Sequence, residues 1–552
     1  MLTNKNKISR RRFLNQASLG LLAFSSAPSW LNAMQGMSAS PTLPPNKATP
    51  NFKPDIELDL ICRLNQIAIL PGQTTRVQQY IGVLIKGPKN TLIEIPGSYL
   101  GPIINLYKGQ RVRINLHNRL ELGEPTVTHW HGLHVPAEMD GHPSYAINPM
   151  ETLVYEFEVV NRAGFNLYHP HPHETTGLQV YQGLAGALLV HDGEEDALGL
   201  PSGEYELPLV IQDRRFDEHN QFVYTGHGMH ERMFGFYGDR ILVNGRVECQ
   251  FNVATRAYRL RIANVSNARI YKLGWDDGTP LTVIGVDGGL LEQPETKPYV
   301  MLAPAERLDV WVDFSGRSLG TQVVLRSLAF TGALPMMAQR GMGGMHQQNL
   351  LPVGSDYPIV TMKITQKVTD SPRLPSQLST FARYHPEHTA NPTTPVPIAI
   401  SEGHMSMLLN GRPYAHNDFQ AFEHIKLNTL QLMEIFHEHG MGGHSGGRRG
   451  GMGGMMRGGM MGGGMMAMAH PIHLHGQAFQ ILSRSIADNA AAHYATVSAG
   501  FINNGLKDTV LVMPGETVKI IKPFQDYKGV FMYHCHNLEH EDMGMMREFL
   551  VE

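Results

Sequence analysis

The feature that most constrains the fold is a turn followed by a strand pattern, which occurs three times along the 552-residue chain. The three copies read Pro149-Met150-Glu151, Pro304-Ala305-Glu306 and Pro514-Gly515-Glu516. A unit that recurs at this interval indicates a repeated structural module. We therefore expect three similar domains, at about residues 51–196, 197–365 and 366–552, each of a size usual for a β-sandwich.

Strand patterns dominate the rest of the chain. In residues 111–116 and 258–262 apolar and polar residues alternate, as they do on a half-buried strand. No long amphipathic helix pattern is found. The sequence therefore predicts an all-β fold.

The repeat also relates two histidine motifs to each other. The interval from Glu151 to His169-Pro170-His171 equals the interval from Glu516 to His534-Cys535-His536. At the same interval after Glu306 the chain reads Val324-Leu325-Arg326. We expect the middle domain to be a structural spacer that has kept the scaffold without the ligands.

The N-terminus reads as a targeting segment. Ser9-Arg10-Arg11-Arg12-Phe13-Leu14 precedes an apolar run over residues 19–24, which resembles a twin-arginine export signal, although a chance basic and apolar leader remains the alternative. The run is shorter than the roughly 20 residues that cross a bilayer, so no stable membrane anchor is expected. We expect residues 1–50 to be a signal with a flexible lead-in, the export machinery to be a partner, and the location to be periplasmic.

Composition excludes some classes of protein and favours others. With 46 basic and 49 acidic residues, the chain has no basic stripe for nucleic acid. Its three cysteines, Cys62, Cys249 and Cys535, stand singly, so no disulfide framework is expected. The 28 His and 30 Met point toward soft-metal chemistry.

Four short segments concentrate the histidines. They are His129-Trp130-His131, His169-Pro170-His171, His470-Pro471-Ile472-His473-Leu474-His475, and His534-Cys535-His536 continuing to His540 and Met545. Residues i and i+2 of a strand face the same side, so each segment presents two imidazoles together. Eight imidazoles exceed the needs of a mononuclear site and suit a cluster of three copper ions.

Cys535 must face the opposite side from His534 and His536. With His470, His540 and Met545 it completes the two-His, one-Cys, weak-axial-Met set of a blue-copper site. One strand would then touch two metal centres and give an electron a short covalent route between them. Zinc is a poorer fit, because it requires only four tetrahedral ligands.

In order and spacing, these segments resemble the copper-binding signatures of the multicopper oxidase family, which includes laccases and bacterial cuprous oxidases. The resemblance implies three cupredoxin-like Greek-key β-sandwich domains and four coppers that reduce dioxygen to water. It implies a type 1 copper on His470, Cys535, His540 and Met545. It places type 2 copper on His129 and His473, and the type 3 pair on His131, His169, His171, His475, His534 and His536.

Several polar residues near these motifs have open roles. Asp140 and Glu541 are predicted proton donors for oxygen reduction, but each could instead be an ordinary buried hydrogen-bonding carboxylate. Histidines outside the pattern are expected at the surface or in packing: His117, His134, His142 and His173.

A Met- and Gly-rich insert over residues 440–469 ends directly before His470. Thioethers favour Cu(I), and a second patch around Met336 and Met342 repeats the composition, so the insert is interpreted as a recruiter of Cu(I). Met466 and Met468 are the predicted ligands of substrate copper. The resemblance is closest to periplasmic copper-efflux oxidases, whose substrate site also has an Asp that this stretch lacks. The alternative is a Gly-rich linker.

These observations predict a monomeric oxidase that couples oxidation of Cu(I), and of phenols more slowly, to reduction of dioxygen, for copper tolerance. A laccase that acts mainly on phenols or aromatic amines is the runner-up. A copper-binding or storage protein is the alternative from another class. A catalytically inactive relative is disfavoured because every expected ligand position is occupied.

Overall fold

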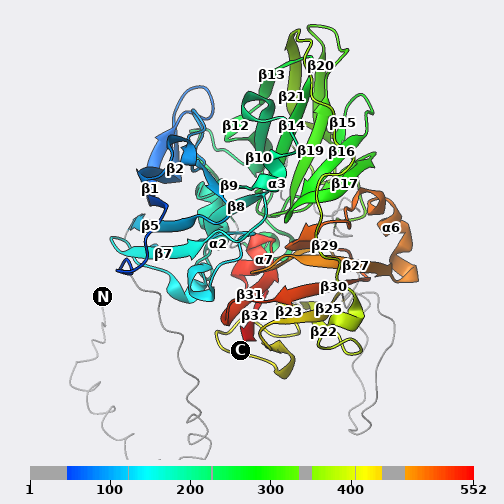
Figure 1. The fold of residues 1–552 in the computed structure, drawn as a ribbon. Coiled ribbons are helices and arrows are strands. Elements are labelled where there is room, and N and C mark those ends of the chain that lie inside the picture. The colour runs from blue at the N-terminus through cyan, green and yellow to red at the C-terminus, as the bar shows by residue number, and fades with distance from the viewer. Residues whose placement is uncertain (1–46, 122, 226–227, 335–350, 404–405, 438–466) are drawn as a thin grey trace, which may run out of the picture. The chain divides into compact units, whose positions relative to one another are not determined.

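The computed structural model describes residues 47–552 except 122, 226–227, 335–350, 404–405 and 438–466. These residues form mostly β-strands, as Figure 1 shows, and the predicted all-β class is confirmed. The export motif, most of the predicted insert and the patch around Met336 lie outside the described residues.

The described strands form three pairs of sheets that follow one another along the chain. The first pair has the orders β2(Thr75–Lys86)-β1(Ile56–Ile67)-β5(Arg111–Arg119)-β7(Thr152–Glu158) and β3(Leu92–Ile93)-β4(Ile103–Tyr107)-β9(Gly186–His191)-β8(Gly164–Pro170)-β6(Thr128–His129). We call this pair the first sandwich.

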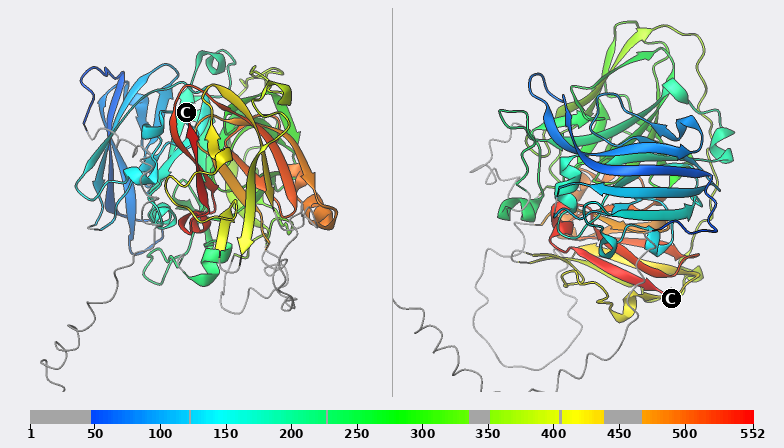
Figure 2. Two further views of the ribbon diagram at one scale, coloured as in Figure 1. Left: turned by 90° about the horizontal axis from the view of Figure 1, so that it is seen from below. Right: turned by 90° about the vertical axis from the view of Figure 1, so that its left-hand side faces the viewer.

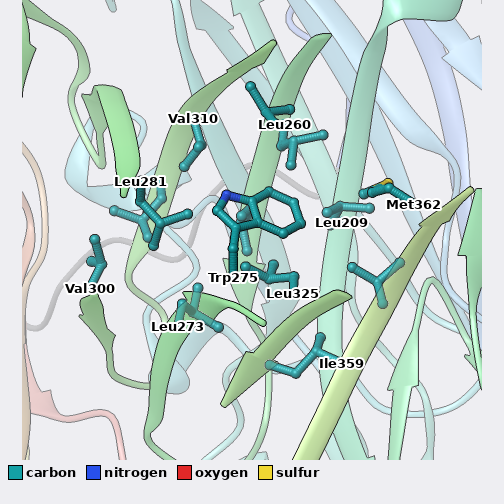
Figure 3. Packing of buried hydrophobic residues seen from close by; sticks show 14 of the residues in the cluster. Leu209, Leu260, Leu273, Trp275, Leu281, Val300, Val310, Leu325, Ile359 and Met362 are labelled. Atoms are coloured by element: carbon teal, nitrogen blue, oxygen red, sulfur yellow. The ribbon is translucent and has the colours of Figure 1, made fainter. Parts of the chain in front are cut away.

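The middle sandwich follows. Its sheets have the orders β12(Arg246–Val247)-β11(Arg240–Val243)-β10(Glu206–Arg214)-β14(Ala257–Asn264)-β19(Arg307–Asp313)-β16(Leu281–Val286)-β17(Gly289–Lys297) and β13(Gln250–Ala254)-β21(Tyr357–Gln366)-β20(Gln322–Ser327)-β15(Tyr271–Trp275)-β18(Val300–Leu302). In Figure 3 the indole of Trp275 lies among Leu209, Leu260 and Val310 in the core between these sheets.

The third sandwich contains the C-terminal strands. Its sheets have the orders β23(Ser406–Leu409)-β22(Val396–Gly403)-β25(Thr429–His437)-β30(Glu516–Phe524)-β27(Phe479–Ile486)-β28(Leu506–Lys507) and β24(His424–Ile425)-β32(Met546–Val551)-β31(Gly529–Cys535)-β26(His470–Leu474)-β29(Thr509–Val512). In both views of Figure 2 its red C-terminal strands lie beside the blue and cyan strands of the first sandwich.

The same pairing recurs in all three sandwiches. A parallel pair, β1 with β5, β10 with β14, or β22 with β25, is followed by an antiparallel partner, β7, β19 or β30. Each antiparallel partner begins at or beside the Glu of one Pro-x-Glu turn. The internal repeat therefore marks equivalent strands of three similar sheets.

The geometry of the turn explains why its sequence recurs. The central residue has a positive φ in every copy, 75° at Met150, 68° at Ala305 and 73° at Gly515. Each Glu side chain accepts a hydrogen bond from the backbone N–H three residues earlier, namely Asn148 (2.7 Å), Ala303 (2.8 Å) and Met513 (2.8 Å). This side-chain bond helps to hold a backbone conformation that L-residues otherwise avoid.

Helices are short and few in the described residues. The α-helices are α2(Thr176–Gln182), α3(Gly193–Asp196), α4(Met229–Phe234), α6(Ala491–Ala495) and α7(Leu538–Asp542), and the 3₁₀ turns are η2(Lys89–Thr91), η3(Ala137–Met139), η4(Pro143–Tyr145), η5(Gly203–Tyr205), η7(Pro386–His388), η8(Ala421–Glu423), η9(Asp488–Ala490) and η10(Ser498–Gly500). Helix α7 follows β31 directly and contacts α2 of the first sandwich and α4 of the middle one. No helix of the described part is both long and apolar enough to cross a bilayer.

The described end of the predicted flexible lead-in is held on the first sandwich. The backbone N–H of Thr49 donates to Glu156 at 3.1 Å, and Arg113 donates to the carbonyl of Phe52 at 2.9 Å. The sequence did not predict these contacts, because they join segments far apart in the chain.

Candidate metal centres

Cys535, His470 and His540 come together at one end of the third sandwich. The Cys535 sulfur lies 3.5 Å from Nδ1 of His470 and 3.7 Å from Nδ1 of His540. Met545 is fully buried in the same core, and its carbonyl accepts the N–H of Cys535 at 3.0 Å. These four residues, which we call the Cys535 site, are the predicted type 1 set.

The outer nitrogens of the two imidazoles are held by oxygen acceptors. Nε2 of His540 donates to the carbonyl of Met233 in α4 at 3.3 Å, and Nε2 of His470 donates to Glu402 at 2.9 Å. A proton on Nε2 leaves Nδ1, which faces the sulfur, without a proton, as a metal ligand must be. Both imidazoles are therefore oriented as metal ligands.

Eight other histidines form a second centre between the first and third sandwiches, which we call the eight-histidine cluster. They lie on or beside β6, β8, β26 and β31: His129, His131, His169, His171, His473, His475, His534 and His536. All eight are buried. The structure brings together every predicted member of the type 2 and type 3 sets.

The ring nitrogens divide the cluster into smaller groups. Nε2 of His129 and Nε2 of His473 are 3.4 Å apart. Nε2 of His534 lies 3.2 Å from that of His171 and 3.1 Å from that of His475. The rings of His131, His169 and His536 form the remaining group, with centroids 5.1–5.6 Å apart. A division into two, three and three ligands matches one type 2 and two type 3 ions.

Several ring nitrogens of the cluster have no hydrogen-bond partner, which indicates that they bind a metal. Among the described residues, Nδ1 of His131, Nε2 of His169 and both ring nitrogens of His536 are buried without a hydrogen-bond partner. The opposite nitrogens mostly donate to oxygen, as Nδ1 of His129 does to the carbonyl of Asp140 at 2.6 Å. Buried unpaired nitrogens are costly, and metal ligation satisfies them.

The protonation states favour ligation as well. Burial, with a further contribution from neighbouring histidines, lowers the pKa of His169 and of His540 to about 3. These rings are therefore neutral, which is the form that binds a metal. Burial raises the pKa of the Cys535 thiol, so its proton leaves only when a cation binds the sulfur.

The two predicted proton donors lie at the cluster. Asp140 Oδ2 accepts from Nδ1 of His475 at 2.8 Å, and burial raises the pKa of Asp140. The following Gly141 has φ 79°, and a Cβ there would lie 2.2 Å from the carbonyl of Thr128, so glycine permits this close approach to β6. Glu541 Oε2 lies 3.1 Å from Nδ1 of His534, and neither of its oxygens has an aligned hydrogen-bond partner in the described part.

The four histidines outside the pattern pair with residues other than the predicted copper ligands. His117 contacts Thr152, His134 contacts Asp526, and His173 is 40% exposed. His142 is buried and its Nε2 lies 2.9 Å from Glu548, in the seam between the first and third sandwiches. Surface and packing positions were predicted for these four.

Three polar residues that the sequence did not single out support predicted ligands, two by direct contact and one through another residue. Glu402 holds His470, Asp508 lies 3.1 Å from Nε2 of His131, and Arg307 of the middle sandwich binds Asp508. None of these three residues belongs to a sequence motif, so the neighbouring residues do not distinguish it from an ordinary polar residue. The middle sandwich, predicted to be a spacer, thus supports both centres: the carbonyl of Met233 contacts His540, and Arg307 binds Asp508, which lies against His131.

Comparison with known proteins identifies the family. Models described as multicopper oxidase match residues 77–195 and 460–552. A laccase from Bacillus stratosphericus is 30% identical over 519 residues, which cover 83% of this chain and 90% of the relative. The chain belongs to the multicopper oxidase family. It is thus a copper-dependent oxidoreductase that uses dioxygen.

Solved multicopper oxidases share the fold. McoA from Aquifex aeolicus superposes with a TM-score of 0.71 at 29% identity, covering 91% of this chain and 97% of that one. A multicopper oxidase from Campylobacter jejuni, described as a metallo-oxidase, gives 0.66 at 26% identity, covering 90% and 91%. The predicted arrangement of three cupredoxin-like sandwiches is confirmed.

Proposed function

We propose that this multicopper oxidase oxidises Cu(I), and phenols more slowly, and couples this to reduction of dioxygen to water in the service of copper tolerance. We further propose four coppers per chain, one on the Cys535 site and three on the eight-histidine cluster. When bound, these ions take single electrons from the reductant and pass four of them to dioxygen.

The observation that carries the proposal is the group of side chains at the outer edge of His470. Glu402 Oε1 accepts from Nε2 of His470 at 2.9 Å and from the backbone N–H of Met468 at 3.1 Å, and it lies 3.3 Å from Nε2 of His437. Burial opposes ionisation of Glu402, but hydrogen bonds from His437 and His470 outweigh it and hold its pKa below the usual range. A carboxylate, an imidazole and a nearby methionine form a surrounding suited to a copper ion rather than to a bulky aromatic ring.

Both methionine-rich segments join the described structure at this place. The N–H of Ala469 lies 3.4 Å from the carbonyl of Ala333, and Leu334 packs in the same small core as Ala469. Met468 is buried, whereas Met466, the other predicted substrate ligand, lies outside the described residues. The sequence composition of both segments therefore supports delivery of Cu(I) to His470.

The relatives support both candidate substrates. The Campylobacter jejuni structure is described as a metallo-oxidase, which agrees with Cu(I) as donor. The Bacillus stratosphericus relative is named a laccase, which keeps phenols as the second candidate. The buried surroundings of His470 favour the small ion.

We propose also that the chain is exported by the twin-arginine route to the periplasm and acts there as a monomer. The support is the Ser9–Leu14 motif with its short apolar run. Cell fractionation of a variant with Arg11 and Arg12 changed to Lys would test the route.

The first test is oxygen uptake with Cu(I) as sole donor, comparing the wild type with a variant that lacks residues 441–466. We expect the deletion to abolish oxidation of Cu(I), while phenol turnover survives or rises because every predicted copper ligand is kept. Unchanged Cu(I) oxidation would make laccase the better description. Binding of many more than four coppers with little oxygen uptake would favour a storage protein instead.

A second test addresses Glu402 itself. Glu402→Gln should raise KM for Cu(I) by about 10–100-fold, the usual effect of losing a residue that supports a metal ligand, and should change KM for a phenol much less. Glu434→Gln on neighbouring β25 is the matched control, since within the described residues the ion pair of Glu434 is with Lys519, at 3.7 Å. Equal losses with both substrates would mean that Glu402 only orients His470.

A further inference from the structure

Arg307 of the middle sandwich binds the segment beside the eight-histidine cluster through its side chain, next to Asp287, whose carboxylate accepts from the N–H groups of Asp508 and Thr509 at 3.3 Å. Arg307 is the first residue of β19, directly after the Pro-x-Glu turn of that sandwich, and is fully buried. Its Nη1 donates to Asp508 Oδ1 at 2.7 Å and its Nη2 to Asp508 Oδ2 at 2.5 Å. Two parallel charge-assisted bonds fix the plane of the carboxylate.

The rest of the guanidinium is fixed by backbone carbonyls. Nε donates to Phe165 of the first sandwich at 3.0 Å, while Nη1 and Nη2 donate to Ala305 at 3.0 Å and Asp287 at 3.1 Å. Arg307 is therefore bonded to all three sandwiches at once. A side chain held by five bonds has little freedom to reorient.

Asp508 passes this constraint to two predicted copper ligands. Its Oδ1 lies 3.1 Å from Nε2 of His131, and its backbone carbonyl accepts from Nδ1 of His473 at 2.9 Å. A proton on Nε2 of His131 leaves Nδ1 as the ligand atom, and Nδ1 is the buried nitrogen without a partner. The same aspartate thus orients a type 3 and a type 2 ligand.

The glycine after His131 makes room for this arrangement. Gly132 has φ 94°, and a Cβ there would lie 2.6 Å from Nη2 of Arg307 and 2.4 Å from Oδ1 of Asn166. Any larger residue would collide with the guanidinium and adopt a strained backbone. The His-Trp-His-Gly segment is therefore shaped to admit Arg307.

We propose that Arg307 is a positioning residue for the three-copper cluster, through which docking of the middle sandwich fixes His131 and His473 as ligands. Without the guanidinium, Asp508 is a buried carboxylate that has lost its main partner and its fixed orientation. The inference rests on the proposed assignment of the eight histidines to three coppers. It does not depend on which reductant the enzyme uses.

The test compares Arg307→Gln and Arg307→Lys with Arg269→Gln in the copper-loaded protein. Arg269 is an equally buried arginine of the middle sandwich, but it binds Asp213 at 2.8 Å within that sandwich. Copper per chain is measured after dialysis against increasing chelator, together with the type 2 EPR signal and the copper–thiolate absorption of the Cys535 site. Thermal unfolding of each variant reports general stability.

We expect Arg307→Gln to weaken retention of cluster copper by about 10–100-fold and to alter the type 2 signal, with the copper–thiolate band unchanged. Lysine should restore part of the loss, because it keeps the charge without the two-pronged geometry. Wild-type retention in Arg307→Gln, or an equal loss in Arg269→Gln, would overturn the proposal.

Asp508→Asn provides an independent variant should Arg307→Gln fail to fold. It should show the same selective loss of cluster copper, and full retention would overturn the proposal. If the wild type itself binds only the Cys535-site copper, the proposed function fails. If the wild type and the variants all hold four coppers, the proposed function stands and only the role of Arg307 is refuted.

Discussion

The Cys535 site and the eight-histidine cluster are built in different ways, although they share β26 and β31. All four residues of the Cys535 site belong to the third sandwich, on β26, β31, α7 and the turn before β32. The cluster takes four histidines from the first sandwich and four from the third, and the middle sandwich adds Arg307. The first centre therefore takes all its ligands from one sandwich, with a single supporting bond from His540 to Met233 of the middle one, whereas the second takes its ligands from two sandwiches that must dock.

The two centres differ also in which sandwich supplies the residues that hold the ligands. His470 is held by Glu402 of its own sandwich. His475 is held by Asp140 of the first sandwich at 2.8 Å, and His131 of the first is held by Asp508 of the third. Each outer sandwich thus orients ligands supplied by the other. Damage to docking should harm the cluster before it harms the Cys535 site.

The largest effect is expected from Cys535→Ser. Removal of the sulfur should eliminate the copper–thiolate absorption and abolish oxygen uptake with every reductant, while the cluster keeps its copper because none of its ligands is changed. Absorption, copper content and oxygen uptake would measure this. Cys249→Ser, a buried cysteine of the middle sandwich, is the control, and oxidase activity that survived Cys535→Ser would contradict the assignment.

A smaller effect is expected from Asp140→Asn. This change should reduce the supply of protons to the cluster without changing its copper content. The amide cannot donate a carboxyl proton, so kcat should fall by about 100-fold or more, the usual contribution of a positioned acid. Copper content and the copper–thiolate band should stay at wild-type levels. Asp526→Asn, at a residue 58% exposed, is the control. Loss of copper in Asp140→Asn would show instead that the carboxylate acts by holding His475.

The smallest effect is expected at the seam between the outer sandwiches. Glu548 Oε1 lies 2.9 Å from Nε2 of His142 of the first sandwich, and accepts from Tyr414 and His416 of the third at 2.9 Å and 2.8 Å. Burial opposes its ionisation, but the bonds from His142 and His416 outweigh burial and lower its pKa to about 2.

Because the folded pKa of Glu548 is below the unfolded value, its ionised form stabilises the fold above about pH 4.5, and the contribution disappears as the pH falls through about 2. Glu548→Gln should therefore lower the free energy of unfolding by up to about 3 kcal/mol at pH 7, with a shrinking difference below pH 4.5. Denaturant unfolding at several pH values measures this. If Glu548→Gln releases cluster copper at a lower temperature than Cys535-site copper, the cluster depends more on docking than the Cys535 site does. If the difference in free energy of unfolding between variant and wild type does not change with pH, the ionic contribution of Glu548 is refuted.

Much of the site was predictable because its signals are short in sequence. The two-residue spacing keeps both imidazoles of a pair at the same strand end: His129 is the last residue of β6, and His131 follows it in the turn. The positive φ of the Pro-x-Glu turn and the side-chain bond of its Glu impose a local sequence in all three sandwiches. The repeat could therefore be found without a structure.

The sequence by itself determined the strand pattern, the threefold repeat, the two sets of predicted copper ligands and the soft-metal composition, since each is written in neighbouring residues. Only the tertiary structure decided that Glu402 meets His470, that Asp508 meets His131, and that Arg307 binds Asp508. These pairs are separated by long stretches of chain, and a single polar residue has no periodicity to mark it. Their roles arise from burial, where a charged group must find a partner and the packing of three sandwiches determines which one it meets.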